Sequence, residues 1–431
     1  MNYINYLYRK VLGIDIVKIF SLNAISTLVR MLAGLISVKV VAVIIGPAGV
    51  ALMGQLNSFS TILLSLANGG ISNGIIKYVS EDKADTETMK KILSAALRIT
   101  LFFTVIVAVL LVVFHGFLSL WIFQSDKYGY VFVVFGFTII LYSLNVLLLA
   151  ILNGYKDFKR IVTVNICGTI LGLIYSIILV VNFGLSGAMI NAVTFQSVMF
   201  FVTLWMCRKC VWMEWSNFRE RIDVEWLIRY MKYSLMTLIS IMLVPVSQII
   251  LRGYVIADIS ITEAGWWEGM NRISAMYLSV ITASFSVYYL PKLSEIKDNV
   301  ELRREIYRCY KFIVPFLVIV SVTLYFLRNF IVWLLFTPDF YPMEQFFLWQ
   351  FLGDFFKICS WLLAYLMVAK AMTKYFIVTE VVFAFSNLLF SFLLMKVNGT
   401  VGLTQGYLLN YILYFGCMVF LFRKVLFVKN I

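Results

Sequence analysis

Apolar stretches that are long enough to cross a bilayer follow one another along the whole chain of 431 residues. Hydrophobic residues make up 62% of the chain and charged residues only 13%, and a soluble domain of this length has too little interior to bury so much apolar surface. A span needs about 20 mostly apolar residues, and by that measure we predict an all-α polytopic membrane protein with about 12 transmembrane helices. Their expected ranges are 18–45, 48–76, 92–114, 129–152, 160–181, 185–207, 226–251, 264–290, 310–327, 344–369, 374–396 and 401–422.

Lysine and arginine residues gather on one side of these expected spans. If the N-terminus lies in the cytoplasm, cytoplasmic segments hold 28 of the 36 basic residues, whereas Lys127, Arg252, Arg328 and Lys396 fall on the outer side. Cytoplasmic loops carry such an excess in most membrane proteins, so we expect both termini to be cytoplasmic. Segment 1–18 lacks the apolar core and cleavage site of a signal peptide, and we expect it to remain as an amphipathic lead-in.

The most polar cytoplasmic segment, residues 208–232, divides six expected spans from six others. Because six is even, the two halves have parallel topology. Segments 48–81 and 264–295 both begin with Ala-Gly and end at a glutamate, which indicates an internal repeat unless the letters recur by chance. We predict a six-helix bundle at 1–207, a cytoplasmic linker at 208–225 and a second six-helix bundle at 226–431, placed around a central cavity.

Charged residues inside the expected spans are the most informative positions. Each costs about 2.5 kcal/mol or more in hydrocarbon unless it faces a cavity, a partner or a substrate. Arg30 lies too deep to reach either surface, and its guanidinium suits phosphate or carboxylate. An anion site and a structural salt bridge to Glu268 or Asp354 are the two interpretations. The charged residues within the spans that we single out are Arg30, Lys39, Arg272, Asp354, Lys357 and Glu380.

Two pairs of opposite charges lie close together in sequence. Asp354 precedes Lys357 by three residues and Glu268 precedes Arg272 by four, so each pair shares a helical face and can neutralise itself. Glu380 has no such partner in sequence. We therefore predict that Glu380, and after it Asp354, couples transport to an ion gradient.

Polar residues recur at spacings of three and four on several spans, which places them on one helical face. We predict that they line the cavity; the alternative is ordinary helix packing, for which small polar residues are common in membranes. The predicted lining residues are Asn23, Ser26, Ser58, Thr61, Ser65, Asn68, Gln248 and Glu268.

Several classes of function are disfavoured by the residues. His115 is the only histidine, and Cys207 and Cys210 have zinc-knuckle spacing without a second ligand pair. We expect no metal and no other cofactor. Basic residues sit at span ends rather than on one soluble face, so we expect no nucleic-acid binding. The outer loops are short and no catalytic constellation appears, so we predict that the chain is not an enzyme.

Four stretches of the sequence resemble one family of membrane proteins. They are Gly46–Gly49 (GPAG), Ile281–Glu295 (ITASFSVYYLPKLSE), residues 333–340 (WLLFTPDF) and Trp349–Lys357 (WQFLGDFFK). They are similar to the Wzx-type flippases of the polysaccharide transporter family, within the multidrug/oligosaccharidyl-lipid/polysaccharide (MOP) exporter superfamily. These proteins translocate undecaprenyl-pyrophosphate-linked O-antigen or enterobacterial common antigen (lipid III) repeat units across the bacterial inner membrane.

The resemblance implies an alternating-access flippase built from two six-helix bundles in a MATE-like arrangement. It implies that basic residues in the cavity meet the lipid pyrophosphate, and the positions available are Arg30, Lys39, Arg272 and Lys357. Its partners would be the undecaprenyl-pyrophosphate oligosaccharide, membrane lipid, a polysaccharide polymerase and a chain-length regulator. The alternatives are a MATE-type multidrug antiporter, a membrane glycan polymerase or ligase, and a scaffold for assembly.

Overall fold

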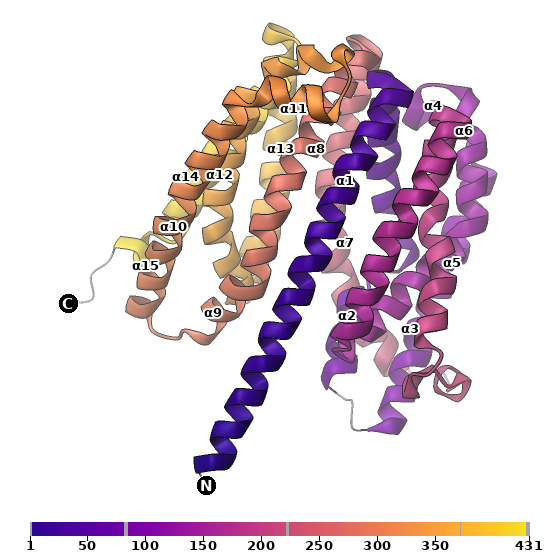
Figure 1. The fold of residues 1–431 in the computed structure, drawn as a ribbon, viewed down its shortest axis with the longest axis vertical. Coiled ribbons are helices and arrows are strands. Elements are labelled where there is room, and N and C mark those ends of the chain that lie inside the picture. Colours follow the sequence, from indigo (N-terminus) through magenta and orange to yellow (C-terminus); the bar gives the residue numbers. More distant parts are fainter. Residues whose placement is uncertain (1, 82–84, 221–223, 371, 428–431) are drawn as a thin grey trace. The chain divides into compact units, whose positions relative to one another are not determined.

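The computed structural model describes residues 2–81, 85–220, 224–370 and 372–427, and within them the side chains of 2–26, 28, 224, 232, 233, 235, 236, 239, 283, 284, 286 and 287 are not described. Every described element is helical (Figure 1). The α-helices are α1 (Asn2–Ala67), α2 (Ser72–Glu81), α3 (Thr86–Val113), α4 (His115–Phe123), α5 (Gly129–Gly154), α6 (Phe158–Cys207), α7 (Val224–Asp258), α8 (Ile261–Ser284), α9 (Leu290–Glu295), α10 (Asn299–Phe326), α11 (Arg328–Leu335), α12 (Glu344–Ala369), α13 (Thr373–Asn398), α14 (Val401–Leu421) and α15 (Arg423–Phe427). Shorter helical turns lie at Asp126–Tyr128, Val211–Met213, Trp215–Phe218, Phe285–Tyr289 and Pro338–Met343.

Eight segments of the described chain are long and apolar enough to cross a membrane. Two of them contain a kink at a glycine with non-helical backbone angles, Gly46 in α1 and Gly184 in α6. The expected spans 18–45 and 48–76 meet at the first kink, and 160–181 and 185–207 meet at the second. The prediction of an all-α polytopic membrane protein is confirmed.

Three helix boundaries use the same short motif, a glycine followed three residues later by another glycine. The first glycine has φ near +60° at each: 63° at Gly46, 56° at Gly184 and 58° at Gly399. The ψ values are −174°, −131° and −147°. This region of backbone space is adopted almost only by glycine. At each of these positions a glycine breaks the helix, and no longer loop is needed to connect the two helical segments.

The second glycine of the motif permits close packing. A Cβ at Gly187 would collide with the Leu179 carbonyl, and one at Gly402 would collide with the Leu394 backbone. In α6, Tyr175 Oη also lies 2.9 Å from Thr194 Oγ1. The Leu179–Gly187 and Tyr175–Thr194 pairs both join residues on the two sides of Gly184. The two halves of α6 therefore run antiparallel against each other.

The expected span 48–76 is interrupted, which the apolar pattern did not predict. α1 ends at Ala67 and α2 begins at Ser72, and Asn68 donates to the Leu64 carbonyl at 2.7 Å. Gly69 and Gly70 have φ of 59° and 64°. The Gly69 carbonyl accepts a hydrogen bond from Ser234 of α7. The two glycines allow the chain to turn, and Ser234 satisfies the Gly69 carbonyl, which has no partner within its own helix.

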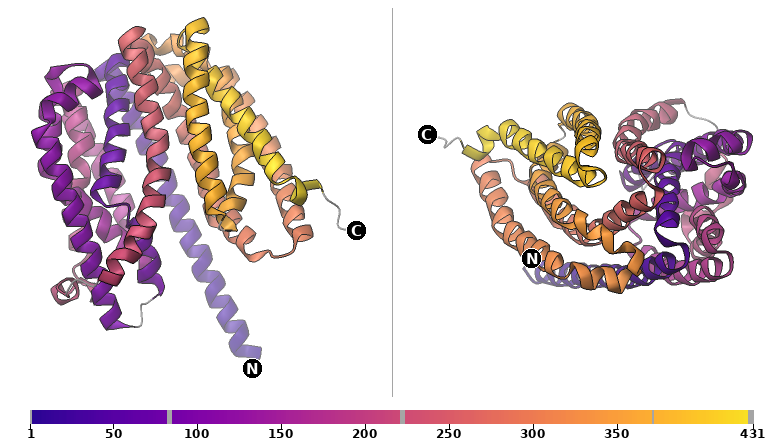
Figure 2. Two further views of the ribbon diagram at one scale, coloured as in Figure 1. Left: turned by 180° about the vertical axis from the view of Figure 1, so that it is seen from behind. Right: turned by 90° about the horizontal axis from the view of Figure 1, so that it is seen from above.

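The chain divides into two compact units. Unit 1 comprises Met1–Ile44 and Phe59–Met242, and unit 2 comprises Ile45–Ser58 and Leu243–Ile431. In unit 1 the core is formed by α2, α3, α5, the end of α6 and the start of α7, with Ile92, Ile151 and Tyr230 buried. In unit 2 it is formed by α8, α9, α10, α12 and α14, with Leu293, Ile358 and Met418 buried. Figure 2 shows these helices from two further sides.

Candidate functional site

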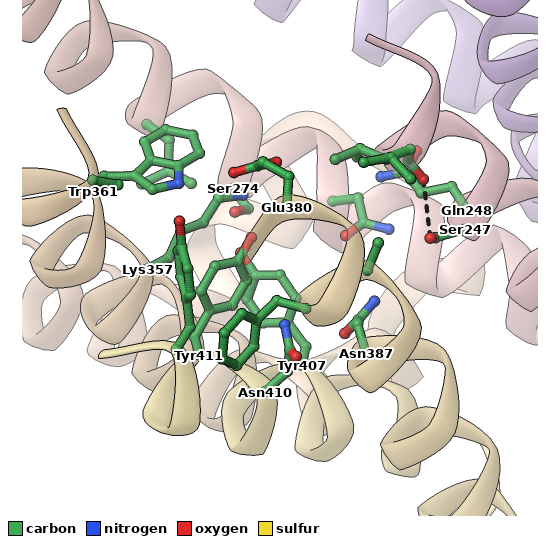
Figure 3. Close-up of a pocket in the computed structure, with 18 of the residues that line it drawn as sticks. Ser247, Gln248, Ser274, Lys357, Trp361, Glu380, Asn387, Tyr407, Asn410 and Tyr411 are labelled. Atoms are coloured by element: carbon green, nitrogen blue, oxygen red, sulfur yellow. Dashed lines mark hydrogen bonds between the residues drawn. The ribbon is translucent and has the colours of Figure 1, made fainter. Parts of the chain in front are cut away.

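Unit 2 contains a cavity of about 650 Å³ among α7, α8, α12, α13 and α14. Its wall combines aromatic rings with amide and hydroxyl groups, and Figure 3 shows Lys357, Glu380, Tyr407 and Tyr411 at this cavity. Such a wall has flat apolar faces and hydrogen-bonding groups for a polar ligand. The polar and aromatic lining residues include Ser247, Gln248, Trp267, Asn271, Ser274, Gln350, Lys357, Trp361, Tyr365, Phe376, Glu380, Phe383, Asn387, Tyr407, Asn410, Tyr411 and Tyr414.

The ammonium group of Lys357 is held among aromatic rings. Its Nζ lies 5.0 Å from the ring centre of Trp361, 5.5 Å from that of Tyr407 and 5.4 Å from that of Tyr411. The negative faces of aromatic rings attract a cation at these distances. Lys357 also interacts electrostatically with Asp354 and Glu380. A cation is therefore stabilised at the cavity wall without a tight ion pair that would occupy its donors.

Asp354 is fully buried and serves as the acceptor for side chains from two other helices. Ser274 of α8 donates at 2.6 Å, Tyr407 of α14 at 2.7 Å and Gln350 at 3.3 Å. Tyr277 of α8 donates as well. The sequence suggested that Asp354 and Lys357 neutralise each other. In the structure the carboxylate is satisfied mainly by neutral hydroxyl and amide donors, and it joins α8, α12 and α14.

A second charged cluster in unit 2 is centred on Glu268. Arg252 donates to Glu268 at 2.6 Å and Arg272 donates to it at 3.2 Å, so the predicted i,i+4 pair is present with an added cation. Arg252 also donates to Gln55 at 3.2 Å and to Ser58 at 3.4 Å. The side chain of Arg252 is 1% exposed, so it is buried within unit 2. Arg272 is engaged by Glu268, so it is a weaker pyrophosphate candidate than Lys357.

Arg30 lies in unit 1 and lines a separate pocket of about 300 Å³. Its side chain is exposed, and no described carboxylate of unit 1 forms an ion pair with it. Asn145 and Leu149 of α5 and residues 164–169 and 195–199 of α6 contribute to the same pocket. The guanidinium is therefore open to an anion within this unit.

The remaining predicted positions differ in their surroundings. Ser58 bonds Gln248 at 3.4 Å, which joins two predicted lining residues. Ser65 donates to the Thr61 carbonyl at 2.9 Å, and Asn68 likewise bonds its own helix, which satisfies these groups locally. Lys39 is half-buried in α1. Asn23 and Ser26 have side chains outside the described part of the chain.

Sequence reasoning identified Asp354 and Lys357 of the unit 2 site but missed Gln350, Trp361, Tyr407, Tyr411 and Tyr414. Gln350, Asp354, Lys357 and Trp361 are spaced by four, three and four residues, and Tyr407, Tyr411 and Tyr414 by four and three. Both spacings mark one face of a helix. The aromatic content of the second stripe concealed it, because tyrosine is also common in membrane helices for other reasons.

The fold is shared with solved membrane transporters. A MATE-family multidrug transporter of the MOP superfamily in an inward-facing conformation aligns with a TM-score of 0.74 at 12% identity, covering 93% of this chain and 98% of the other. The lipid II flippase MurJ aligns with a TM-score of 0.73 at 14% identity, covering 94% and 87%. These likenesses show the fold, and the predicted MATE-like architecture is confirmed.

Sequence comparison gives the family. The model of the polysaccharide biosynthesis protein family matches residues 40–345, and the chain belongs to this family. It is also 31% identical over 401 residues to the lipid III flippases of Escherichia coli (strain K12) and Shigella flexneri, covering 93% of this chain and 96% of each relative. The predicted family resemblance is confirmed, and these relatives are named as transporters rather than enzymes.

Proposed function

We propose that this chain is a flippase for undecaprenyl-pyrophosphate-linked oligosaccharide, an O-antigen or enterobacterial common antigen repeat unit. It would move this lipid from the cytoplasmic to the periplasmic leaflet by alternating access. The observation that carries the proposal is the 31% identity to proteins named lipid III flippase, over 93% of this chain and 96% of theirs. The polar interiors of the two units are compatible with a charged, hydroxyl-rich headgroup.

We assign the cationic residues to the pyrophosphate and the amide and aromatic residues to the sugars. Arg30 presents an exposed guanidinium, whose fork of donors matches a phosphate group. Lys357 adds a second cation, and bonds between ionised partners are about twice as strong as neutral ones. The amides and rings around Lys357 offer hydrogen bonds and stacking faces for sugars. Lys39 and Arg272 are further cations that we assign to the headgroup path, and Asn23, Ser26, Thr61, Ser65 and Asn68 to its lining.

The remaining assignments follow from this function. We place the protein in the bacterial inner membrane with both termini cytoplasmic, and we propose residues 1–207 and 226–431 as the two bundles that move against each other. A polysaccharide polymerase and a chain-length regulator are the partners that would act on the flipped lipid. A multidrug antiporter shares the fold, but cationic drugs would require a more acidic site than the unit 2 cavity, where Lys357 accompanies Glu380.

The test is complementation of flippase-null strains, one lacking the lipid III flippase and one lacking an O-antigen flippase. The wild-type chain should restore surface glycan in at least one of them. Restoration of neither, with the protein present in the membrane, would contradict the proposed function. Altered drug susceptibility without glycan export would favour the antiporter instead.

Arg30→Ala should lower glycan export at least about tenfold in the complemented strain, because a hydrogen bond to a charged group contributes about 1.5–3 kcal/mol. Surface glycan is measured on gels and membrane protein level by immunoblot. Arg208→Ala, which removes an exposed arginine at the end of α6, is the matched control and should export normally. Normal export by Arg30→Ala at normal protein level would remove Arg30 from pyrophosphate binding.

Glu380→Gln should abolish proton movement that accompanies transport in proteoliposomes. Glu380 is half-buried at the cavity and interacts with Lys357, so a proton on it would change the charge next to that cation. Glycolipid-induced proton flux is compared with that of Glu295→Gln, an exposed glutamate at the end of α9. Unchanged flux in both Glu380→Gln and Asp354→Asn would exclude these residues from coupling.

A further inference from the structure

The pocket of unit 1 is lined by amide side chains as well as by Arg30. Arg30 of α1 faces a set of amide side chains, Asn145 of α5 and Asn165 and Gln196 of α6. Asparagine and glutamine are expensive to place within a membrane bundle unless their donors and acceptors are satisfied. Three amides around one space of about 300 Å³ therefore need an explanation beyond helix packing.

Asn145 supplies the decisive observation. Its side chain is 1% exposed, and its amide nitrogen donates to Gln196 Oε1 at 2.9 Å. Its carbonyl oxygen Oδ1 is buried and has no hydrogen-bond partner. A buried unsatisfied acceptor costs about 1–3 kcal/mol. The amide is thus fixed by Gln196 with its acceptor unused, at a residue that lines the pocket.

Another part of the pocket wall is apolar and packs closely against two glycines of α6. A Cβ at Gly168 would come within 3.1 Å of Met199, and a Cβ at Gly172 within 2.7 Å of the Phe195 ring. Met199 and Phe195 line the pocket. The space therefore offers a guanidinium, an unused acceptor and an apolar wall together. This combination suits a sugar, which has hydroxyl or amide donors on its edge and C–H groups on its face.

We propose that this pocket binds the sugar attached directly to the pyrophosphate. Arg30 holds the adjacent phosphate, and Asn145 Oδ1 accepts a hydrogen bond from a hydroxyl or an acetamido N–H of that sugar. The inference rests on the proposed function, because it assigns the part of the substrate that unit 1 recognises. Asn145 is then a specificity-determining residue, since a sugar without a donor at that position leaves the acceptor unpaired.

The experiment measures equilibrium binding to the purified full chain in lipid nanodiscs. The probes are N-acetylglucosamine 1-phosphate, glucose 1-phosphate and inorganic pyrophosphate. Asn145→Leu should weaken binding of at least one sugar phosphate about tenfold, the effect of one hydrogen bond, and leave pyrophosphate binding unchanged. Arg30→Gln should weaken all three probes. The sugar phosphate that loses more to Asn145→Leu identifies the donor as hydroxyl or acetamide.

The matched control is Asn191→Leu, because Asn191 is another α6 asparagine whose Oδ1 is buried without a partner, outside this pocket. Asn165→Leu changes a half-buried pocket residue and should weaken sugar phosphate binding if Asn145→Leu fails to fold. Equal affinity of the wild type for pyrophosphate and sugar phosphates, or equal losses in the Asn145 and Asn191 variants, would overturn the proposal. Neither result would affect export by the wild-type chain, so the proposed function is judged separately.

Discussion

Glu268→Ala should destabilise the protein by about 3–5 kcal/mol, the cost of removing one partner from a buried ion pair. Glu268 is the carboxylate that compensates both Arg252 and Arg272. Without it, Arg252 keeps only the neutral acceptors Gln55 and Ser58 and the Trp267 ring, 5.5 Å from its guanidinium carbon. The measurement is thermal unfolding in detergent, followed by tryptophan fluorescence.

The matched control is Glu225→Ala at the start of α7. Glu225 pairs with Arg229 at 2.5 Å, but the two side chains are 67% and 46% exposed. An exposed pair contributes about 0–1 kcal/mol, so this variant should unfold near the wild-type temperature. The double variant Arg252→Met, Glu268→Leu should recover part of the loss, because no uncompensated charge is left at position 252. Equal effects of Glu268→Ala and Glu225→Ala would contradict this account of the cluster.

Asp354→Ala should destabilise the protein by about 3 kcal/mol or more, because several buried donors lose their acceptor at once. Ser274 and Gln350 are 4% and 2% exposed, so water cannot easily replace the carboxylate. Asp354→Asn should have a smaller effect. It keeps one acceptor oxygen but turns an amide N–H₂ toward donors such as Tyr407 or Ser274.

The same unfolding assay checks this prediction, with Asp258→Asn as control at the exposed end of α7. The stability order should be Asp258→Asn above Asp354→Asn above Asp354→Ala. A stable Asp354→Ala that has lost transport would instead make the carboxylate part of the mechanism and not of the framework. That outcome would return Asp354 to the ion-coupling candidates.

Features determined by local sequence were predicted well. Helical spans follow from length and hydropathy alone, and the divisions at 45–48 and 181–185 coincide with Gly46 and Gly184. Intramembrane charge identified Arg30, Lys357 and Glu380, because a charge in hydrocarbon always requires a compensating environment. The break at Asn68–Ile71 was missed because hydropathy continues across it.

Features determined by distant partners could not be predicted. Asp354 is bonded by Ser274 and Tyr407, which lie 80 and 53 residues away, so the sequence pointed to its electrostatic partner Lys357 but not to its hydrogen-bond donors. Arg252 was predicted on the outer side of the membrane without a partner, and the packing of α8 against α7 brings Glu268 to it. The amide of Asn145 is fixed by its hydrogen bond to Gln196, 51 residues away. Residue spacing along one helix therefore could not show that its Oδ1 lacks a partner.

The reversals at Gly184 and Gly399 matter to anyone who maps the topology of this chain with a reporter. Each connection is only one or two residues long, and the following helix at Gly187 or Gly402 lies against the backbone of the preceding one. An epitope tag or protease site inserted there has no loop to enlarge and must separate two packed helices. The segments 114–128 and 336–343 contain turns and short helices, and an insertion there is far better accommodated.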